Sequence, residues 1–414
     1  MEAWMNDVPA AIVAAKAALR DGMNDRRDRM AALDAWLEKE VTAVRAEQAA
    51  GGAVPVLAFA DIAAGRVREE DRARIRRRGC AIVRGVMPRE QADGWNAEIG
   101  RYIDENDYYE RAKSKVGMDQ YFALLDSARP QIFGLYWSRP QVQARQHESL
   151  AATRAFLNRL WTFDGPDGPV FDPDRECTYA DRVRRRQPGD KTIGLSPHAD
   201  GGSVERWCDP SFHAVYRDLL SGDPLAYDPW IAAGRTETKE IPSPAVCSLF
   251  RTFQGWTALT RQGPGDGTLR LAPIAGAMGW MILRALQDDV AADDLCGARP
   301  GRALAAFPQW HAKLLEAVVP IPVVEPGDTV WWHPDVIHAV EDEHRGSGYS
   351  NVIYIGAAPD CAKNRVFQPR QAKAFLEGRS CPDFAAEDYE VDFVGRAVEA
   401  DLTPLGRRQM GLDA

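Results

Sequence analysis

The spacing of hydrophobic positions along the chain changes from a helical to a strand pattern after the first fifty residues. Between about residues 9 and 49, apolar side chains such as Ile12 and Leu19 recur at helical intervals among charged neighbours. This spacing is typical of amphipathic helices, and Gly22 divides the stretch in two. We therefore predict an N-terminal helical segment over residues 1–52.

Beyond residue 53 the pattern becomes one of short apolar runs bounded by Gly, Pro, Asn and Asp, which is typical of β-strands. The predicted strands cover residues 53–59, 80–84, 191–195, 245–250, 253–260, 268–274, 321–324, 329–332 and 350–356. A helix is predicted over residues 61–78. Many short strands in two sets favour a double-sheet jelly roll whose mouth holds a ligand. The predicted fold class is therefore α+β with a mainly β core, a double-stranded β-helix, to which N-terminal and inserted helices are added.

The second segment, residues 53–414, is predicted to be a single domain, since one large core can account for this length. Its jelly-roll core spans about residues 190–358. Helical periodicity over residues 278–286 and 302–318 predicts a helical insertion at about 277–318. A C-terminal extension covers about residues 359–414. Tyr136 and Trp137 are candidates for the substrate pocket, but aromatic side chains of this kind are more often buried in a core.

Composition limits the function classes. Hydrophobic residues make up 45% and charged residues 27% of the chain, as in ordinary globular proteins. The formal net charge of −9 argues against general binding to nucleic acid or to an anionic membrane. The seven cysteines form no CxxC pair, and the acidic N-terminus does not resemble a signal peptide. We expect a cytoplasmic protein with free thiols that binds neither nucleic acid nor membranes.

Two basic runs stand out, over residues 72–78 and 182–186. Runs of like charge usually form a solvated face, and this is the prediction for both. The second run precedes the strand with the candidate metal ligands. Near the mouth of a pocket, it would favour an anionic substrate.

The chemistry of the chain centres on His198, Asp200 and His338. In an extended strand, side chains two positions apart point to the same side, so His198 and Asp200 can bind one ion. Pro197 precedes this pair, and a Gly-Asp turn followed by an apolar stretch leads to His338. Two imidazoles and one carboxylate on one face of a metal, with the opposite face open, suit non-haem Fe(II) and O2 chemistry. These three residues are the predicted metal-binding and catalytic residues.

Three other histidines, His147, His213 and His311, are expected to be packed or solvent-facing side chains, and His344 is expected to lie in the loop that follows His338. His333 is the reserve candidate for the distal ligand. His338 is preferred because it stands at the end of the predicted strand.

Three stretches resemble the iron- and 2-oxoglutarate-dependent oxygenases of the phytanoyl-hydroxylase type: residues 197–202, 250–260, and 327–338. Residues 78–86 and the tail from Pro382 to Leu412 are similar to a microbial and fungal branch of that group. The resemblance covers most of the chain beyond about residue 55. It implies Fe(II) and 2-oxoglutarate as cofactors, His338 as the distal ligand, and O2 and a small molecule as substrates.

Such an oxygenase also needs a cation for the far carboxylate of 2-oxoglutarate, best supplied by the planar fork of an arginine. The resemblance implies an arginine soon after the distal histidine, but residues 347–349 are Ser, Gly and Tyr. Arg345 is the nearest substitute. Arg251 and Arg270, on neighbouring predicted strands, are its rivals.

The predicted function is hydroxylation of a small molecule with release of succinate and CO2. One alternative is a metal-dependent hydrolase or isomerase on a cupin-like barrel, with the metal as Lewis acid. Another is a non-catalytic metal-binding protein, since a fold does not fix a function.

Overall fold

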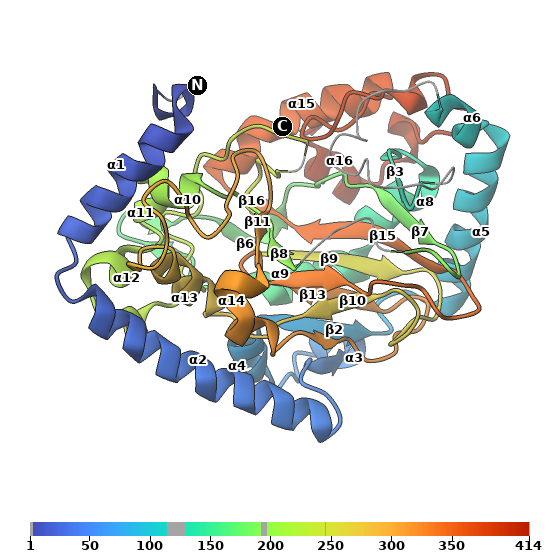
Figure 1. Cartoon of the computed structure of the whole chain (residues 1–414). Helices are drawn as coiled ribbons and strands as arrows, with labels where there is room; N and C mark the ends of the chain where they lie inside the picture. Colours follow the sequence, from blue (N-terminus) through green and yellow to red (C-terminus); the bar gives the residue numbers. More distant parts are fainter. Residues whose placement is uncertain (1–2, 114–129, 192–196, 245, 414) are drawn as a thin grey trace.

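The computed structural model describes residues 3–113, 130–191, 197–244 and 246–413. Most of the strand predicted over residues 191–195 therefore lies outside the described residues. The rest forms a mixed α+β architecture, in which β-sheets at the centre are surrounded by helices (Figure 1).

Helices occur throughout the described chain. They are α1 (Val8–Asp21), α2 (Arg26–Ala49), α3 (Phe59–Ala63), α4 (Glu69–Arg78), α5 (Arg89–Glu105), α6 (Tyr108–Ala112), α8 (Arg139–Arg145), α9 (Glu148–Asn158), α10 (Glu205–Cys208), α11 (Pro210–His213), α12 (Arg217–Ser221), α13 (Ala277–Arg284), α14 (Pro308–Leu315), α15 (Ala362–Glu377) and α16 (Pro404–Met410). Short 3-10 turns are η1 (Ala3–Asn6), η2 (Pro224–Ala226), η3 (Tyr389–Val391) and η4 (Glu399–Asp401). Among the described residues, no helix combines the length and apolarity that crossing a membrane requires.

The strands are mostly short. They are β1 (Val56–Ala58), β2 (Cys80–Arg84), β3 (Ile132–Phe133), β4 (Asp164–Gly165), β5 (Gly168–Pro169), β6 (Asp172–Glu176), β7 (Val183–Arg186), β8 (His198–Ala199), β9 (Phe253–Ala258), β10 (Leu269–Leu271), β11 (Leu304–Ala305), β12 (Val319–Pro320), β13 (Thr329–Trp332), β14 (His338–Val340), β15 (Ser350–Ala357) and β16 (Pro359–Asp360).

Two sheets carry the core in the part of the chain that is described. The larger has seven strands in the order β1-β2-β13-β9-β15-β7-β3, and the smaller has five in the order β11-β8-β14-β10-β12. Only the β1–β2 pairing is parallel; every other pairing in these sheets is antiparallel. Neighbours such as β9 and β15 are far apart in sequence, so each sheet depends on long-range pairing.

The faces of the two sheets share one apolar core. Val330 and Trp332 of β13 pack there with Trp256 of β9 and with Leu269 and Leu271 of β10. Trp331, between them in sequence, points to the opposite side and joins a second core with α5 and α9. Successive strand residues face opposite sides, and both sides are covered here, so β13 is buried along its whole length.

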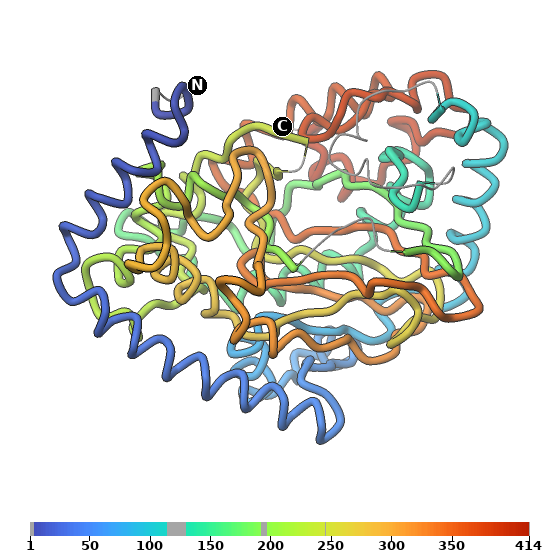
Figure 2. The backbone as a smooth tube through the Cα atoms, viewed as in Figure 1, coloured from blue at the N-terminus to red at the C-terminus, as the bar shows by residue number. Residues whose placement is uncertain are grey.

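The N-terminal helices confirm the prediction from the sequence, since α1 and α2 are separated near Gly22 and α2 ends before Gly51. The buried residues of α2 recur at helical spacing along one side: Met30, Leu33, Leu37, Val41 and Val44. They share a core with α13 and α14, and Figure 2 shows the blue N-terminal tube running along the outside of the molecule. The N-terminal segment therefore packs on the sheet-bearing part of the chain.

Several local predictions need correction. The strand predicted over 321–324 lies instead at 319–320, as β12. Residues 61–78 form two helices, α3 and α4, instead of one. The helix predicted over 302–318 begins only at Pro308, because Leu304 and Ala305 form β11 and pair with β8. Residues 246–250 form no strand. The basic run 182–186 is not a solvated face, because it forms β7 between β15 and β3.

Candidate functional site

Neighbouring strands of the smaller sheet bring the three predicted ligands together. β8 pairs with β14 so that His198 lies directly opposite His338. Asp200 follows β8, two positions after His198, on the same side of the extended chain. Each of the three residues offers a ligand atom, and these atoms all lie within 4.8 Å of one another.

The imidazole of His338 is held in one orientation. Its Nδ1 lies 3.1 Å from the backbone carbonyl oxygen of Val336. Because a carbonyl only accepts hydrogen bonds, Nδ1 carries the proton and Nε2 keeps its lone pair. That Nε2 atom is 3.7 Å from Asp200 Oδ2, while His198 Nε2 is 3.6 Å from Asp200 Oδ1. Each histidine therefore turns its Nε2 toward the carboxylate.

The protonation states suit a metal-ligand set. Burial lowers the pKa of His338 to about 4, so its imidazole is neutral near neutral pH. Burial by itself would raise the pKa of Asp200, but His338, His198 and Arg251 lower it below its ordinary value. The site thus presents a carboxylate and a neutral imidazole.

His333, the reserve candidate, is engaged by the protein at both ring nitrogens. Its Nδ1 accepts from the Asp335 backbone N–H at 3.0 Å, and its Nε2 lies 3.0 Å from the Pro229 carbonyl oxygen. The ring stacks on Trp161 with centroids 4.6 Å apart, and burial lowers its pKa to about 3. His333 is therefore a packed core residue.

A cavity of about 180 Å³ contains the three candidate ligands. Its apolar wall includes the aromatic side chains of Tyr179, Trp256, Trp332, Tyr354 and Phe384. Tyr136 and Trp137 do not line it; they are buried in an adjoining core that includes Tyr179, as the sequence favoured. Three arginines, Arg182, Arg184 and Arg251, also line the cavity.

Arg184 on β7 is the most deeply buried of these arginines, with 5% of its surface exposed. Nη2 makes long contacts to Ser350 Oγ at 3.3 Å and Gln262 Oε1 at 3.4 Å, and Nε has no hydrogen-bond partner. No carboxylate among the described residues pairs with it. Burial lowers the pKa of Arg184, because the interaction with Tyr354 offsets only part of the lost hydration of its charge.

The side chain of Arg184 lies in a part of the cavity that is distant from His338. Gln262 Oε1, which Arg184 contacts, also accepts from Thr268 Oγ1 at 3.2 Å. Thr268 lies opposite Glu341, whose N–H donates to its carbonyl oxygen. Glu341 is three residues beyond His338, which corresponds to roughly 10 Å along a strand.

The arginines singled out from the sequence lie in different places. Arg251 lines the cavity beside Asp200. Arg270 lies on β10 between the buried residues Leu269 and Leu271, and its side chain contacts the Val318 carbonyl oxygen. Arg345 is exposed, and its N–H donates to the Gly265 carbonyl oxygen at the far end of the β10–β14 ladder, roughly 20 Å from His338. The structure does not bring Arg345 to the predicted ligands.

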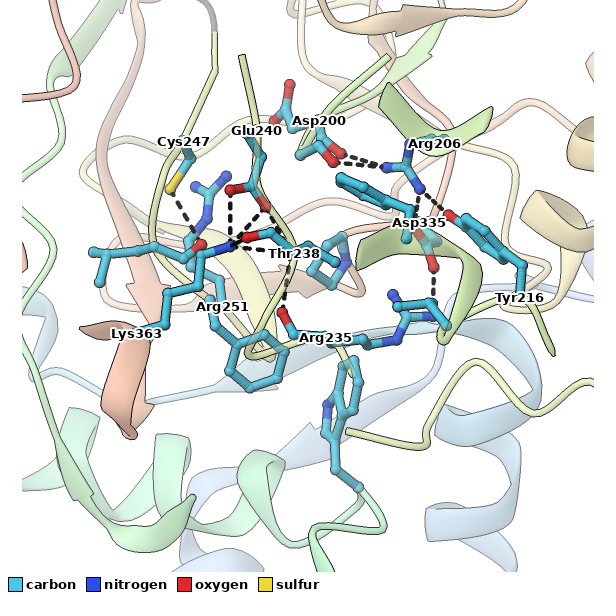
Figure 3. Close-up of a pocket in the computed structure, with 17 residues that line it drawn as sticks. Asp200, Arg206, Tyr216, Arg235, Thr238, Glu240, Cys247, Arg251, Asp335 and Lys363 are labelled. Atoms are coloured by element: carbon cyan, nitrogen blue, oxygen red, sulfur yellow. Dashed lines mark hydrogen bonds and ion pairs between the residues drawn. The ribbon is translucent and has the colours of Figure 1, made fainter. Parts of the chain in front are cut away.

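Arg206 connects the two chain segments that carry the ligands (Figure 3). Its Nη2 donates to the carbonyl oxygens of Asp200 and Gly201, at 3.0 and 3.2 Å. Its Nη1 pairs with Asp335 Oδ1 at 3.0 Å, in the loop that leads to His338. Arg235 holds the other oxygen of Asp335 at 2.8 Å. The arrangement fixes Asp200 relative to the turn before His338.

We expect Asp335→Asn to lower the free energy of unfolding by about 3–5 kcal/mol, because it leaves two buried guanidinium groups without their carboxylate. Although burial favours the neutral acid, Arg235 and Arg206 hold the pKa of Asp335 well below its ordinary value. Urea denaturation followed by tryptophan fluorescence measures the change. Asp288→Asn, at an exposed ion pair with Arg26 and Arg27, is the matched control and leaves the transition nearly unchanged.

Sequence reasoning missed Arg184 and Arg206 as site residues. The run of arginines over 182–186 predicts a solvated face, with a place near the pocket mouth as the alternative, and it does not distinguish Arg184 from its neighbours. For Arg206 the sequence carried no signal apart from its position shortly after Asp200. Both are defined by contacts with segments distant in the chain.

A family profile and a bacterial relative both match nearly the whole chain. The sequence profile of the Gig2-like family matches residues 6–412. YbiU of Escherichia coli strain K12 is 45% identical over 410 residues, which cover 98% of this chain and 97% of YbiU.

Two solved structures are similar over nearly the whole chain. A protein of Salmonella typhimurium LT2 superposes with a TM-score of 0.93 at 41% identity, covering 99% of this chain and 98% of the other. GIG2 of Candida albicans, from GlcNAc-inducible gene 2, superposes with a TM-score of 0.79 at 25% identity, covering 97% and 89%.

Proposed function

The chain belongs to the Gig2-like family, and we propose that it is an Fe(II)- and 2-oxoglutarate-dependent oxygenase that hydroxylates a small molecule. One observation carries the proposal. A cavity with two histidines and an aspartate in metal-binding proximity also contains a buried arginine that lacks an acidic partner. The first group suits a metal open on one face, and the second suits an anionic co-substrate.

The donor set fits Fe(II). His198, Asp200 and His338 would hold the metal through two imidazole nitrogens and one carboxylate oxygen. The hydrogen bond from His338 Nδ1 to Val336 leaves Nε2 for the metal and fixes the ring, as outer-shell contacts of metal ligands commonly do. Because three protein ligands leave coordination positions open, a co-substrate and O2 can be accommodated.

The sheet topology supports a double-stranded β-helix as the scaffold. The order β7-β15-β9-β13 in one sheet faces β8-β14-β10-β12 in the other. His198 and His338 stand on adjacent strands of the smaller sheet, and Asp200 directly follows β8. Interiors of such double sheets commonly hold ligands.

The second step of the proposal assigns Arg184 to the far carboxylate of 2-oxoglutarate. Its separation from His338, roughly 10 Å along the strand, suits a five-carbon diacid whose other end binds the metal. The Ser350 hydroxyl accepts from Arg184 Nη2 and donates to Gln262 Oε1, so it helps to hold the guanidinium in place. Arg345 is too far away for this role. Arg251, which the sequence also indicated, lies beside Asp200 at the metal end of the cavity.

When bound, the iron and co-substrate supply the oxidising chemistry, with 2-oxoglutarate converted to succinate and CO2. The protein orients the substrate and excludes water, and the buried aromatic wall formed by Trp256 and Trp332 contributes to that exclusion. Asp200 occupies the carboxylate position, which leaves no vacant protein position for a halide. Hydroxylation is therefore the proposed outcome.

Anaerobic addition of Fe(II) and then 2-oxoglutarate to the purified protein tests the proposal. We expect a weak visible charge-transfer band that needs both additions and disappears when O2 is admitted, with formation of succinate. Zn(II) in place of Fe(II) is the control and gives no band. A protein that binds metal but gives neither band nor succinate would instead favour a Lewis-acid hydrolase or isomerase, or a non-catalytic metal-binding protein.

A further inference from the structure

We infer that Arg251 binds an anionic group, a carboxylate or a phosphate, on the primary substrate. The inference rests on the proposed function and specifies the substrate class of the same site. It comes from the position of Arg251 between two adjoining cavities and from the charges that line them.

A second cavity, of about 50 Å³, adjoins the one that holds the candidate ligands. The two share Asp200, Cys247 and Arg251 in their linings. Its polar wall includes the side chains of Arg206, Tyr216, Arg235, Thr238, Glu240 and Lys363, which Figure 3 labels. A molecule held there would lie next to Asp200, beside the proposed metal position.

Most cations in the two linings already have an acidic partner. Arg206 and Arg235 bind Asp335, Lys363 Nζ lies 2.7 Å from Glu240 Oε2, and Arg182 Nε lies 3.3 Å from Asp181 Oδ1. Among the described arginines and lysines of the linings, Arg184 and Arg251 form no such ion pair. Burying a cation without a partner is costly, so each is suited to an anion that arrives with a ligand.

The surroundings of Arg251 leave its guanidinium available. The group stacks on the ring of Tyr179, 5.3 Å from the centroid, and makes no hydrogen bond within the described residues. Of the acids that interact electrostatically with Arg251, Asp200 is a proposed metal ligand, Asp181 pairs with Arg182, and Asp383 accepts hydrogen bonds from Ser248. Each of the three therefore has another partner, and none forms an ion pair with Arg251.

Gly356 on β15 makes room for the Arg251 side chain. A Cβ atom at that position would lie 3.2 Å from Arg251 Cδ. The glycine thus leaves space for the aliphatic part of the Arg251 side chain, whose planar guanidinium lies at the junction of the two cavities. Such a fork recognises carboxylate and phosphate groups through two parallel hydrogen bonds.

Each of the two arginines without an ion pair is assigned to a different anionic group, Arg184 to the co-substrate and Arg251 to the substrate. Arg184 lines only the cavity between the sheets, where the co-substrate is proposed to lie, whereas Arg251 also lines the adjoining cavity. With 2-oxoglutarate bound at Arg184, Arg251 remains for the substrate.

Isothermal titration calorimetry with small anions tests this inference. Acetate and methyl phosphate are titrated separately into the anaerobic Fe(II) protein saturated with 2-oxoglutarate, with acetamide as the neutral control. We expect saturable binding of at least one anion, no binding of acetamide, and at least tenfold weaker anion binding in Arg251→Gln. Arg251→Lys should fall between them, because it keeps the charge but loses the fork. The stronger probe indicates which of the two anions the substrate carries.

Arg261→Gln, at an exposed arginine paired with Glu325, is the matched control and should bind the probes as the unmodified protein does. Two results would overturn the inference: no saturable anion binding to the unmodified protein, or equal binding to Arg251→Gln. The charge-transfer band is recorded on each variant beforehand. Loss of the band in Arg251→Gln would assign Arg251 to the co-substrate, and absence of the band from the unmodified protein would refute the proposed function separately.

Discussion

Replacing His338 with alanine should abolish metal-dependent turnover and weaken Fe(II) binding by more than about a hundredfold, since loss of even outer-shell support costs 10–100-fold. The substitution removes one of three proposed ligands, and the two that remain cannot hold the metal in an open facial site. Bound iron per chain and succinate formation are the measurements. His198→Ala should behave in the same way.

The fold should survive this change, because His338 lines a cavity and, among the described residues, its side chain hydrogen-bonds only to the nearby Val336 carbonyl. Thermal unfolding checks that point. His333→Ala is the matched control: it removes a buried ring stacked on Trp161, so it should lower stability but retain iron binding. Iron binding that survives in His338→Ala and is lost in His333→Ala would contradict the assignment of the distal ligand.

The convergence of the three candidate ligands could be predicted, because the signals around each of them are local. His198 and Asp200 are two apart, so one extended backbone determines that they share a side. His338 follows a turn and a strongly apolar strand, and Gly327 in that turn has a φ of 94°, which glycine adopts readily. A Cβ there would meet the Met87 carbonyl oxygen at 2.2 Å, so both the turn and the neighbouring loop require glycine.

Arg184 could not be singled out from the sequence, because its environment depends on distant pairing. A run of basic residues usually faces solvent. Here, however, β7 pairs with β15 at one edge and with β3 at the other, and Arg184, opposite Val352 of β15, is buried. Arg345 was selected for its closeness to His338 along the chain. Beyond His338 the chain continues in extended form, so each further residue lies farther from His338. Arg345 is close to His338 in sequence but therefore lies at the far end of the β10–β14 ladder.

The same long-range pairing explains the misplaced elements. Residues 304–305 have helical spacing with their neighbours, but they supply the edge strand β11 beside β8. This pairing places a strand next to His198, and helix α14 begins only after it. Local periodicity therefore predicted the helices on the outside of the molecule better than the short strands around the site.

Replacing Arg184 with glutamine should raise the apparent KM for 2-oxoglutarate at least tenfold, because losing a charge-assisted hydrogen bond to a carboxylate costs roughly 1.5–3 kcal/mol. Iron binding should be unchanged, since Arg184 is remote from the ligand atoms. Stability should not fall sharply, because no acidic residue loses its partner. Succinate formation at varied 2-oxoglutarate measures KM, and iron content and thermal unfolding give the other two values.

Arg185→Gln is the matched control, because Arg185 is the neighbouring arginine on the same strand but lies over Tyr349 instead of lining the cavity. It should leave the KM for 2-oxoglutarate unchanged, as should Arg345→Ala at the exposed loop. A tenfold rise in Arg345→Ala with none in Arg184→Gln would show that the loop after His338 reaches the co-substrate after all. A rise confined to Arg251→Gln would give the co-substrate to Arg251, and the separate anion site proposed for the substrate would then have no cation to form it.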